Sequence, residues 1–511
     1  MNAKRFLILV SVLWATTSLL ILISGKVLFP ADFLGWYYPY KGYEPFRSQS
    51  PFLDNLGLQD VAICFYPYRA FVAQALSQGT FPWWNPIEGA GLPPGALHSN
   101  GSYFLPSWIT YSLFTPLLAW QIDLSLQFFC ASLGAYLLFE RQSANPRAAC
   151  LGALAWSLGG WHAAFFQEPP LAWPLALFPW VWLGLDDIHR GRKRGPWLVA
   201  GGICLSLFVG HVQMTFVPAI LILGYLLLAQ VERKPVMFLS CLSGVLLAAP
   251  HWLQLAQLAS LSERGPLARE QVLTTLLAPR EFLGLLFQNF MGAPSDGFYL
   301  GRTLSQMVVD SREHCLYAGV AVLLLALLAI IRLRDRATKT VVFLCTAGLL
   351  TASSTLVFSG LSALFPQLLI LTPLRFLPFV LFGFCRLAVA GWDSLERTPL
   401  TRIELQLTGA FIGAYALWAA SYILPATSGS PSLGNWLFAL VQYDGVRKPP
   451  YFRGDFGPVF LDLVYTHFRF GSPAVWFPLL LLASLGLITT YVKNRERRFQ
   501  LVAVVLCLDL L

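Results

Sequence analysis

Charged side chains are scarce in this sequence. They make up 12% of its 511 residues, whereas hydrophobic residues make up 56%. Soluble globular domains carry about 25% charged residues, so this composition excludes a soluble protein of ordinary type. The Lys and Arg residues give a formal charge of +9. They cluster between apolar runs and are not interleaved with aromatic residues on a soluble face, which excludes nucleic-acid binding and favours anchoring at an anionic membrane surface.

Paired cysteines and internal repeats are also missing. The nine cysteines are scattered singly, mostly inside apolar runs and without CxxC spacing, which is typical of small core residues rather than of a disulfide framework or a metal site. No fixed repeat period is present. No small-residue cleavage site follows the first apolar run, Phe6–Ser24. We interpret that run as an uncleaved first helix with a cytoplasmic N-terminus.

Long apolar runs dominate what is there. A helix needs about 20 largely apolar residues to cross a membrane, and the sequence predicts an all-α polytopic membrane protein, a single domain of about twelve or thirteen such helices. The predicted spans are Phe6–Ser24, Ala119–Phe139, Ala148–Phe165, Leu171–Asp187, Pro196–Gly210, Met214–Gln230, Val236–Leu258, Cys315–Arg332, Thr340–Phe358, Leu374–Gly391, Glu404–Leu424, Ala474–Val492 and a last one from Phe499. That last run stops at Leu511 without a polar flank, which indicates a truncated chain.

The basic clusters predict the orientation of these helices. All of them fall on the side of Lys4 if Tyr103–Leu118 does not span, and Pro106 and Pro116 interrupt that segment as expected for an interfacial or re-entrant piece. The clusters are Arg141 with Arg147, Arg190 to Arg194, Arg233 with Lys234, Arg332 to Lys339, Arg397 with Arg402, and Lys493 to Arg498. Three long loops, residues 26–118, 259–314 and 425–473, then face the other, extracytoplasmic side.

The first of these loops holds a short amphipathic segment. Pro67 and Gly79 have the spacing of a first helical residue and a C-terminal stop, which predicts a helix lying flat on the membrane surface. Its apolar face would comprise Tyr68, Phe71, Val72, Ala75 and Leu76, with Arg69, Gln74 and Ser77 turned away.

Asp60 lies just before this helix, at the expected depth of the lipid headgroups. A carboxylate there can accept a proton from an attacking hydroxyl or hold a divalent cation. From spacing alone, an ordinary solvated acid is the more common interpretation. After the helix, Trp83, Trp84 and Asn85 form part of a rigid turn whose indole faces suit either the bilayer interface or a sugar ring.

Other polar residues on the outer side have two interpretations each. His211, between two apolar helices, could contact a phosphate or serve only in a turn. Arg302 and Arg375 depart from the positive-inside pattern, and they could bind an anionic group or reach to the interface. Glu168 is the outer acid that we expect to be partly buried. Asn100 starts an Asn-Gly-Ser sequence that we interpret as a chance glycosylation match.

The order of these motifs resembles that of the YfhO-like bacterial membrane proteins of the GT-C glycosyltransferase superfamily. The matching pieces are Asp60 with YPYR at Tyr66–Arg69, PWWNP at Pro82–Pro86, GAGLP at Gly89–Pro93, SLGGW at Ser157–Trp161, GHVQ from Gly210, the Phe298–Gly301 segment and PLRFLPF at Pro373–Phe379. Val212 stands where the family tends to have proline and Ala90 where it tends to have glycine. Members are commonly longer.

The resemblance implies a fold and a reaction. The fold is a helical bundle whose first outer loop carries interfacial helices and the catalytic acid, a position that Asp60 occupies here; Asp32 and Asp54 are weaker candidates. The reaction is sugar transfer from a polyprenyl-phosphate donor to a glycolipid, polymer or protein outside the bacterial cytoplasmic membrane. On this basis Asp60 is the predicted base, or a ligand of Mg²⁺ or Mn²⁺ that assists it.

The remaining predicted contacts follow from the charge of the donor. Arg69, Arg302 and Arg375 would neutralise the leaving lipid phosphate, and His211 would be a secondary phosphate contact. Two other functions stay open at this point: a transporter or flippase of lipid-linked sugars, which needs a cationic outer surface but no acid, and a non-catalytic scaffold in envelope assembly.

Overall fold

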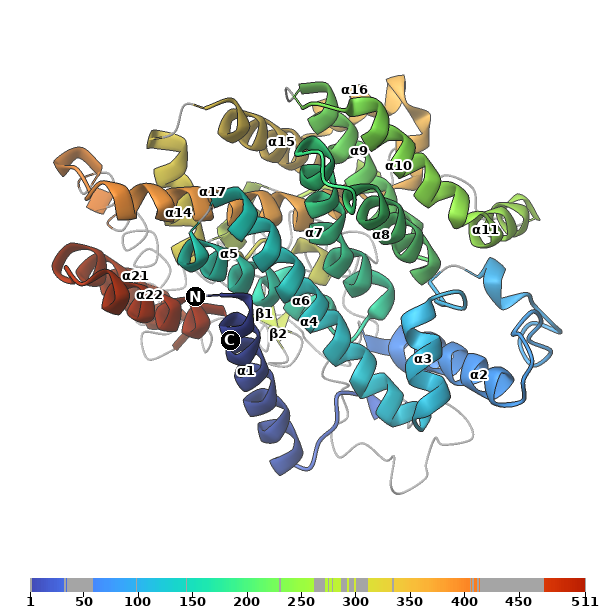
Figure 1. Ribbon diagram of the computed structural model, residues 1–511. Helices are drawn as coiled ribbons and strands as arrows, with labels where there is room; N and C mark the ends of the chain where they lie inside the picture. Colours follow the sequence, from blue (N-terminus) through green and yellow to red (C-terminus); the bar gives the residue numbers. More distant parts are fainter. Residues whose placement is uncertain are drawn as a thin grey trace, which may run out of the picture. The chain divides into compact units, whose positions relative to one another are not determined.

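A computed structural model of the chain describes residues 2–31, 58–97, 99–143, 145–228, 231–261, 279–285, 311–332, 335–404 and 473–510, with a few residues between them. These residues form mainly helices (Figure 1). They group into two compact units. The first unit comprises Met1–Ser157 and His162–Pro266, and the second comprises Leu158–Trp161 and Leu267–Leu511. Each unit is described by itself.

The first unit consists mainly of helices. They are α1 (Ala3–Ile23), α2 (Tyr66–Ser77), α3 (Leu105–Leu113), α4 (Pro116–Ser143), α5 (Pro146–Leu158), α6 (Gly160–Phe165), α7 (Pro169–His189), α8 (Gly195–Val209), α9 (Val212–Leu228), α10 (Lys234–Leu247) and α11 (Ala249–Leu261). A π-helical turn, Val61–Phe65, precedes α2, and a 3-10 turn, Pro94–Ala96, precedes α3. The short ends of α5 and α6 that belong to the second unit are Leu158 and residues 160–161.

Ring contacts fix the direction of α1 against α4. Phe6 stacks on Tyr136 with ring centroids 4.4 Å apart, and Trp14 stacks on Phe128 at 5.1 Å. The two helices are therefore antiparallel, and the N-terminus of α1 lies beside the C-terminal end of α4. The loop that follows α1 consequently starts at the opposite end of the unit, where the Trp120 indole of α4 donates a hydrogen bond to the Leu28 carbonyl.

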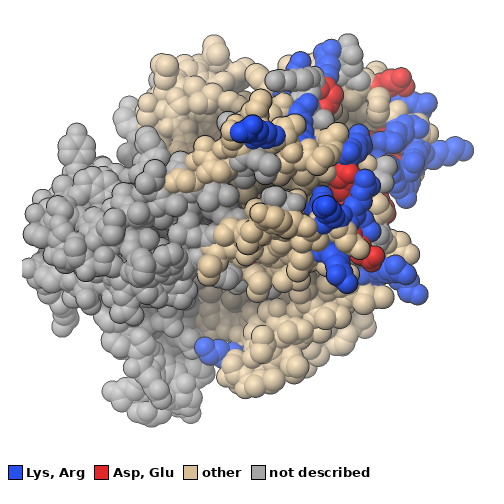
Figure 2. Space-filling model, turned by 90° about the vertical axis from the view of Figure 1, so that its left-hand side faces the viewer, with Lys and Arg blue, Asp and Glu red and all other residues tan. Residues whose placement is uncertain are grey.

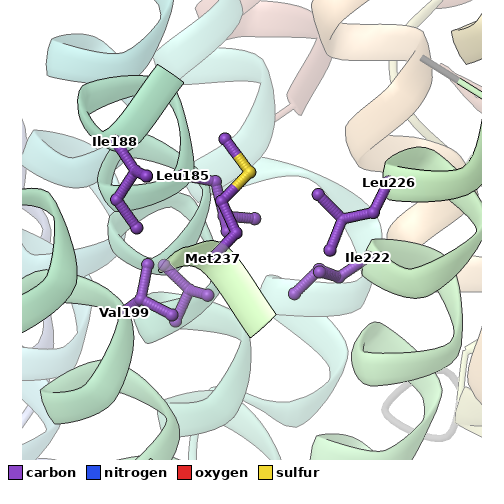
Figure 3. Packing of buried hydrophobic residues seen from close by; sticks show 7 residues of the cluster. Leu185, Ile188, Val199, Ile222, Leu226 and Met237 are labelled. Atoms are coloured by element: carbon purple, nitrogen blue, oxygen red, sulfur yellow. The ribbon is translucent and has the colours of Figure 1, made fainter. Parts of the chain in front are cut away.

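The basic segments of the first unit gather at one end. Arg190, which follows α7, donates through Nη2 to the carbonyl of Arg141 near the end of α4 (3.3 Å). The amide of Glu232, before α10, donates to His189 Nδ1 (3.1 Å). Lys4 belongs to the same end because α1 begins there. Beneath these loops lies an apolar core from α7, α8, α9 and α10, which includes Leu185, Ile188, Val199, Ile222, Leu226 and Met237 (Figure 3). We call the end of the first unit that holds Lys4, Arg141 and Arg190 its basic end.

The second unit is built around two helices that pack closely. It contains α14 (Val320–Arg332), α15 (Arg336–Ser353), α16 (Thr355–Leu364), α17 (Leu377–Arg397), α21 (Pro473–Tyr491) and α22 (Arg495–Leu510), with 3-10 turns at Pro279–Leu285, Ser311–His314, Pro366–Ile370 and Pro373–Phe376. A two-residue antiparallel pair joins β1 (Gly292–Ala293) to β2 (Phe298–Tyr299). A side chain at Gly391 of α17 would overlap the Leu325 carbonyl of α14, so only glycine permits this approach.

The helices confirm the prediction of an all-α polytopic membrane protein. Among the described residues, α1, α4 and Pro373–Arg397 are long and apolar enough to cross a membrane, and the bent pairs α10–α11 and α15–α16 raise the number of such spans to as many as five. Further helices, α8, α9 and α14, are shorter and apolar. The span predicted at Glu404–Leu424 and the long loop at 425–473 lie almost wholly outside the described residues.

Several predicted spans were wrong in that they are not single straight helices. The chain bends by 64° between α10 and α11 and by 95° between α15 and α16. Ala148–Phe165 is divided after Leu158 into α5 and α6, and α14 begins only after Gly319, whose φ of +94° does not continue a helix. These breaks occur inside runs that are mainly apolar on both sides of the break, so composition alone did not reveal them.

Candidate functional site

Asp60 projects from the first loop at the end of the first unit that lies opposite the basic end. It is the residue before the π-helical turn Val61–Phe65, which continues directly into α2. Val61 and Phe65, one helical turn apart, are buried against Trp120 and Leu124 of α4. Since that apolar face is anchored on α4, Asp60 is held on the exposed face of the turn.

A second acid lies near Asp60. Burial, together with the smaller effects of the Asp60 and Glu88 charges, raises the pKa of the Cys64 thiol to about 11. Glu88 accepts a hydrogen bond from the Tyr68 hydroxyl of α2. Burial, followed by that hydrogen bond, raises the pKa of Tyr68. Glu88 is thus engaged by Tyr68, and Asp60 is exposed.

The α2 helix confirms the predicted bounds but corrects its predicted face. It ends at Ser77, and Gly79 follows with a φ of +68°. Gln74 and Ser77 are exposed as predicted. Arg69 is not turned away: only 2% of its side chain is exposed. Its Nη1 lies 2.6 Å from Asp123 Oδ2 and donates to the Ser107 hydroxyl.

Asp123 is the buried partner of Arg69 that the sequence did not reveal. It is fully buried within α4, and besides Arg69 it accepts a hydrogen bond from the Trp173 indole of α7 (3.0 Å). Taking two charges out of water is costly unless they are paired, so burial of Arg69 requires this carboxylate. The Arg69–Asp123 pair therefore fixes α2, and with it the turn that carries Asp60, to α4 and α7.

The guanidinium of Arg69 has two further donors. Among the described residues, its Nε and Nη2 atoms have no hydrogen-bond partner. A side chain added at Gly101 (φ +67°) would place its Cβ 3.3 Å from Arg69 Nη2, so a glycine there leaves room beside this nitrogen. The predicted contact of Arg69 with a phosphate stays a prediction. Such a contact would have to use Nε or Nη2, because Nη1 is paired with Asp123.

The turn that contains Trp83, Trp84 and Asn85, which we call the tryptophan turn, has one buried and two exposed residues. Asn85 is buried and exchanges both backbone hydrogen bonds with Leu92, at 2.8 and 3.0 Å. Trp83 and Trp84 are 61% and 56% exposed. The ring of Trp84 lies over Gly91, where a Cβ would come within 2.7 Å of Cε2. Both indoles are accessible to a lipid or to a sugar, and the two interpretations of this turn stay open.

His211 lies at a junction of three segments in the same unit. Gly210 ends α8 with a φ of +95°, and its carbonyl accepts a hydrogen bond from the Ser99 amide (3.0 Å). His211 itself is buried, and Asn100 beside Ser99 is only 1% exposed. The interpretation of the Asn-Gly-Ser sequence as a chance match stays a prediction.

The predicted contact in the second unit that the structure describes, Arg375, is also buried. Arg375 Nη2 lies 2.6 Å from Glu313 Oε1, and the guanidinium carbon lies 5.8 Å from the centre of the Trp161 ring. The pair explains how an arginine at this position is tolerated. Arg302, Asp32 and Asp54 lie outside the described residues. Glu168 is 5% exposed, which confirms the expected burial.

A metal site is not formed by the part of the chain that the structure describes. Within it, no group of three or more His, Cys, Asp or Glu side chains is positioned to hold a metal ion. The donors described around Asp60 do not fit a divalent cation by themselves, and we derive no chemical step through one.

Comparisons with known proteins give distant structural likenesses. No family model matches the chain, and no curated protein matches it. It is similar to ArnT from Cupriavidus metallidurans bound to undecaprenyl phosphate, at 13% identity and a TM-score of 0.43, over 87% of this chain and 70% of that one. It is also similar to the mycobacterial arabinofuranosyltransferase AftD, at 14% identity and a TM-score of 0.37, over 68% of this chain. The chain spans 25% of the length of AftD. At these identities and TM-scores, neither likeness bears on what the chain does.

Proposed function

We propose that this chain is a membrane glycosyltransferase that transfers a sugar from a polyprenyl-phosphate donor to an acceptor on the side of the bacterial cytoplasmic membrane opposite its basic loops. The observation that carries the proposal is the position of Asp60. Its side chain is exposed at the end of the first unit away from the basic end, on the turn that bears the family-like motifs. A headgroup-level carboxylate is what a base for an acceptor hydroxyl requires.

Asp60 acts as the general base in the proposed reaction. Its carboxylate takes the proton of the acceptor hydroxyl as that oxygen attacks the anomeric carbon of the sugar. The bond between the anomeric carbon and the lipid-phosphate oxygen breaks, and the phosphate leaves on its polyprenyl carrier. Negative charge therefore grows on the phosphate, and cationic groups that meet it lower the barrier.

Within the first unit, the proposed phosphate contacts are Arg69 and His211; the phosphate roles predicted for Arg302 and Arg375 stay predictions. For Arg69, the support is that Nε and Nη2 lack a partner among the described residues while Nη1 holds Asp123. Trp83 and Trp84 are proposed to stack on the sugar, and Asn85 supports their turn through its backbone pairing with Leu92.

The direct test is Asp60→Asn in the full chain, reconstituted with radiolabelled polyprenyl-phosphate sugars and candidate envelope acceptors. We expect transfer to fall by about 100-fold or more, since a positioned general base contributes about 10²- to 10⁴-fold. The matched control is Asp186→Asn, the same change at the basic end, where Asp186 pairs with Arg190; transfer should persist there.

The assay also separates the other functions. A flippase would move labelled carrier lipid across the proteoliposome membrane without forming a new glycosidic bond, and Asp60→Asn would leave that movement intact. A scaffold would give neither product. Undiminished transfer in Asp60→Asn would remove Asp60 from the mechanism.

A further inference from the structure

A buried carboxylate organises three arginines at the basic end of the first unit. Asp187, near the end of α7, has no exposed side-chain area. Arg194 Nε lies 2.5 Å from its Oδ2, Arg141 donates to its Oδ1, and Arg192 Nη1 approaches Oδ1 at 3.6 Å. One negative charge thus meets three positive charges, so this cluster keeps a net positive charge.

The loops that carry these arginines are held in place. A Cβ at Gly191 (φ +72°) would lie 3.0 Å from Arg233 Nη2, so the loop between α7 and α8 contacts the residue before α10. Arg190 and His189 make the hydrogen bonds to α4 and to Glu232 described above. The apolar core in Figure 3 lies directly beneath, with Ile188, Val199 and Met237 buried at the ends of α7, α8 and α10. The cationic groups are therefore prearranged.

The outer face of the cluster is open to its surroundings. The side chains of Arg192 and Arg194 are 46% and 56% exposed, and Lys193 between them is exposed. Figure 2 shows that Lys and Arg gather in one region of the face in view, with some Asp and Glu among them. Trp197, in the first turn of α8, is 80% exposed beside these residues. An exposed indole next to exposed cations is typical of the membrane interface.

We infer that the Arg192–Lys193–Arg194 loop, with Arg141 and Trp197, is a binding site for an anionic phospholipid headgroup. The exposed guanidinium groups would donate to the phosphodiester oxygens. The indole of Trp197 would lie at the level of the glycerol backbone. A lipid fits this site because the positive side chains attract its phosphate while the adjacent Trp197 contacts its apolar part.

The test compares lipid affinity between two charge-matched variants of the full chain in neutral detergent. Arg192→Gln/Lys193→Gln removes two charges from the site and spares the closer Asp187 partners. Arg336→Gln/Lys339→Gln removes two exposed charges from the start of α15 in the second unit. Native mass spectrometry with added phosphatidylglycerol or phosphatidylcholine gives the dissociation constants, and thermal unfolding in detergent checks that both variants fold like the wild type.

We expect phosphatidylglycerol to bind the first variant about 30-fold more weakly than the wild type, because each basic residue near an anionic surface contributes about a fivefold factor. Binding to the second variant should stay within about twofold. Equal affinity in all three proteins, or an equal loss in both variants, would overturn the site. Displacement of the lipid by an equal concentration of glycerol phosphate would show a site for soluble anions and would likewise overturn the proposal.

Discussion

Burial of Arg69 is the feature that most changes how the candidate site works. In the sequence, Arg69 lies on what looks like the polar side of a surface helix, and its partner Asp123 is 54 residues away inside an apolar run. Hydrophobic periodicity assigns Arg69 to water, because periodicity does not register a carboxylate on another helix. The bounds of α2 could be predicted, whereas the ion pair that holds α2 against α4 could not.

We predict that Arg69→Gln destabilises the first unit by about 3–5 kcal/mol, since it leaves the buried carboxylate of Asp123 unpaired. The double variant Arg69→Gln/Asp123→Asn removes both charges and should recover most of that free energy of unfolding. Thermal or denaturant unfolding of the purified protein measures the difference between the two.

The same pair of variants tests the phosphate role of Arg69. If Arg69 also contacts the leaving phosphate, the double variant folds but its transfer activity stays low, with the loss growing at low donor concentration. A double variant that recovers both folding and wild-type transfer would leave Arg69 with a purely structural role.

Helix positions followed from the sequence more closely than helix continuity did. The stop at Gly79 and the N-terminal position of Pro67 gave α2 nearly to the residue. The bends after Leu247 and Ser353 were missed, because apolar residues predominate on both sides of each break. A bend of this kind depends on what the two halves pack against, and a single segment of sequence does not contain that information.

In the tryptophan turn, we predict that Gly91→Ala disrupts the backbone hydrogen bonds between Asn85 and Leu92. The new Cβ would overlap the Trp84 ring, and the φ of +113° is strained for alanine. A cost of about 1–3 kcal/mol follows from such strain. Hydrogen exchange should then accelerate at the paired amides of Asn85 and Leu92.

Gly79→Ala is the matched control for this turn. Gly79 also has a positive φ, +68°, but no atom lies within 4 Å of the Cβ that would be added. It should cost about 1–2 kcal/mol from backbone strain alone and leave the Asn85–Leu92 pairing protected. Unchanged exchange at Leu92 in Gly91→Ala would argue against the packing of Trp84 on Gly91.

At the scale of the whole molecule, each unit has basic residues at one end and a buried arginine–carboxylate pair away from it. In the second unit, Arg332 pairs with Glu404 at one end of α14, whereas the Arg375–Glu313 pair lies near the beginning of α17. The charge pattern predicted the gathering of basic loops, because positive residues are retained on one side of a membrane. It could not predict the buried pairs, which join residues far apart in the chain.

A polar contact between residues still farther apart in the chain joins α22 to the start of α14 within the second unit. Asp509 of α22 is 2% exposed, accepts a hydrogen bond from the Val320 amide at the start of α14 (2.8 Å), and accepts another from the Tyr317 hydroxyl, 192 residues away. A carboxylate at a helix N-terminus satisfies amides that have no partner within the helix. We expect Asp509→Ala to destabilise the second unit by about 1–3 kcal/mol, because the buried Val320 amide loses its acceptor.

Hydrogen exchange followed by mass spectrometry measures this effect by segment. In Asp509→Ala, exchange should accelerate in α14 and α22 while α4 and α7 of the first unit keep their wild-type protection. Tyr317→Phe removes one hydrogen bond and keeps the cap on Val320, so it should cost about 1 kcal/mol and leave the first turn of α14 protected. Uniform acceleration across both units in Asp509→Ala would mean that the contact stabilises the whole fold, and would contradict a local capping role for α22.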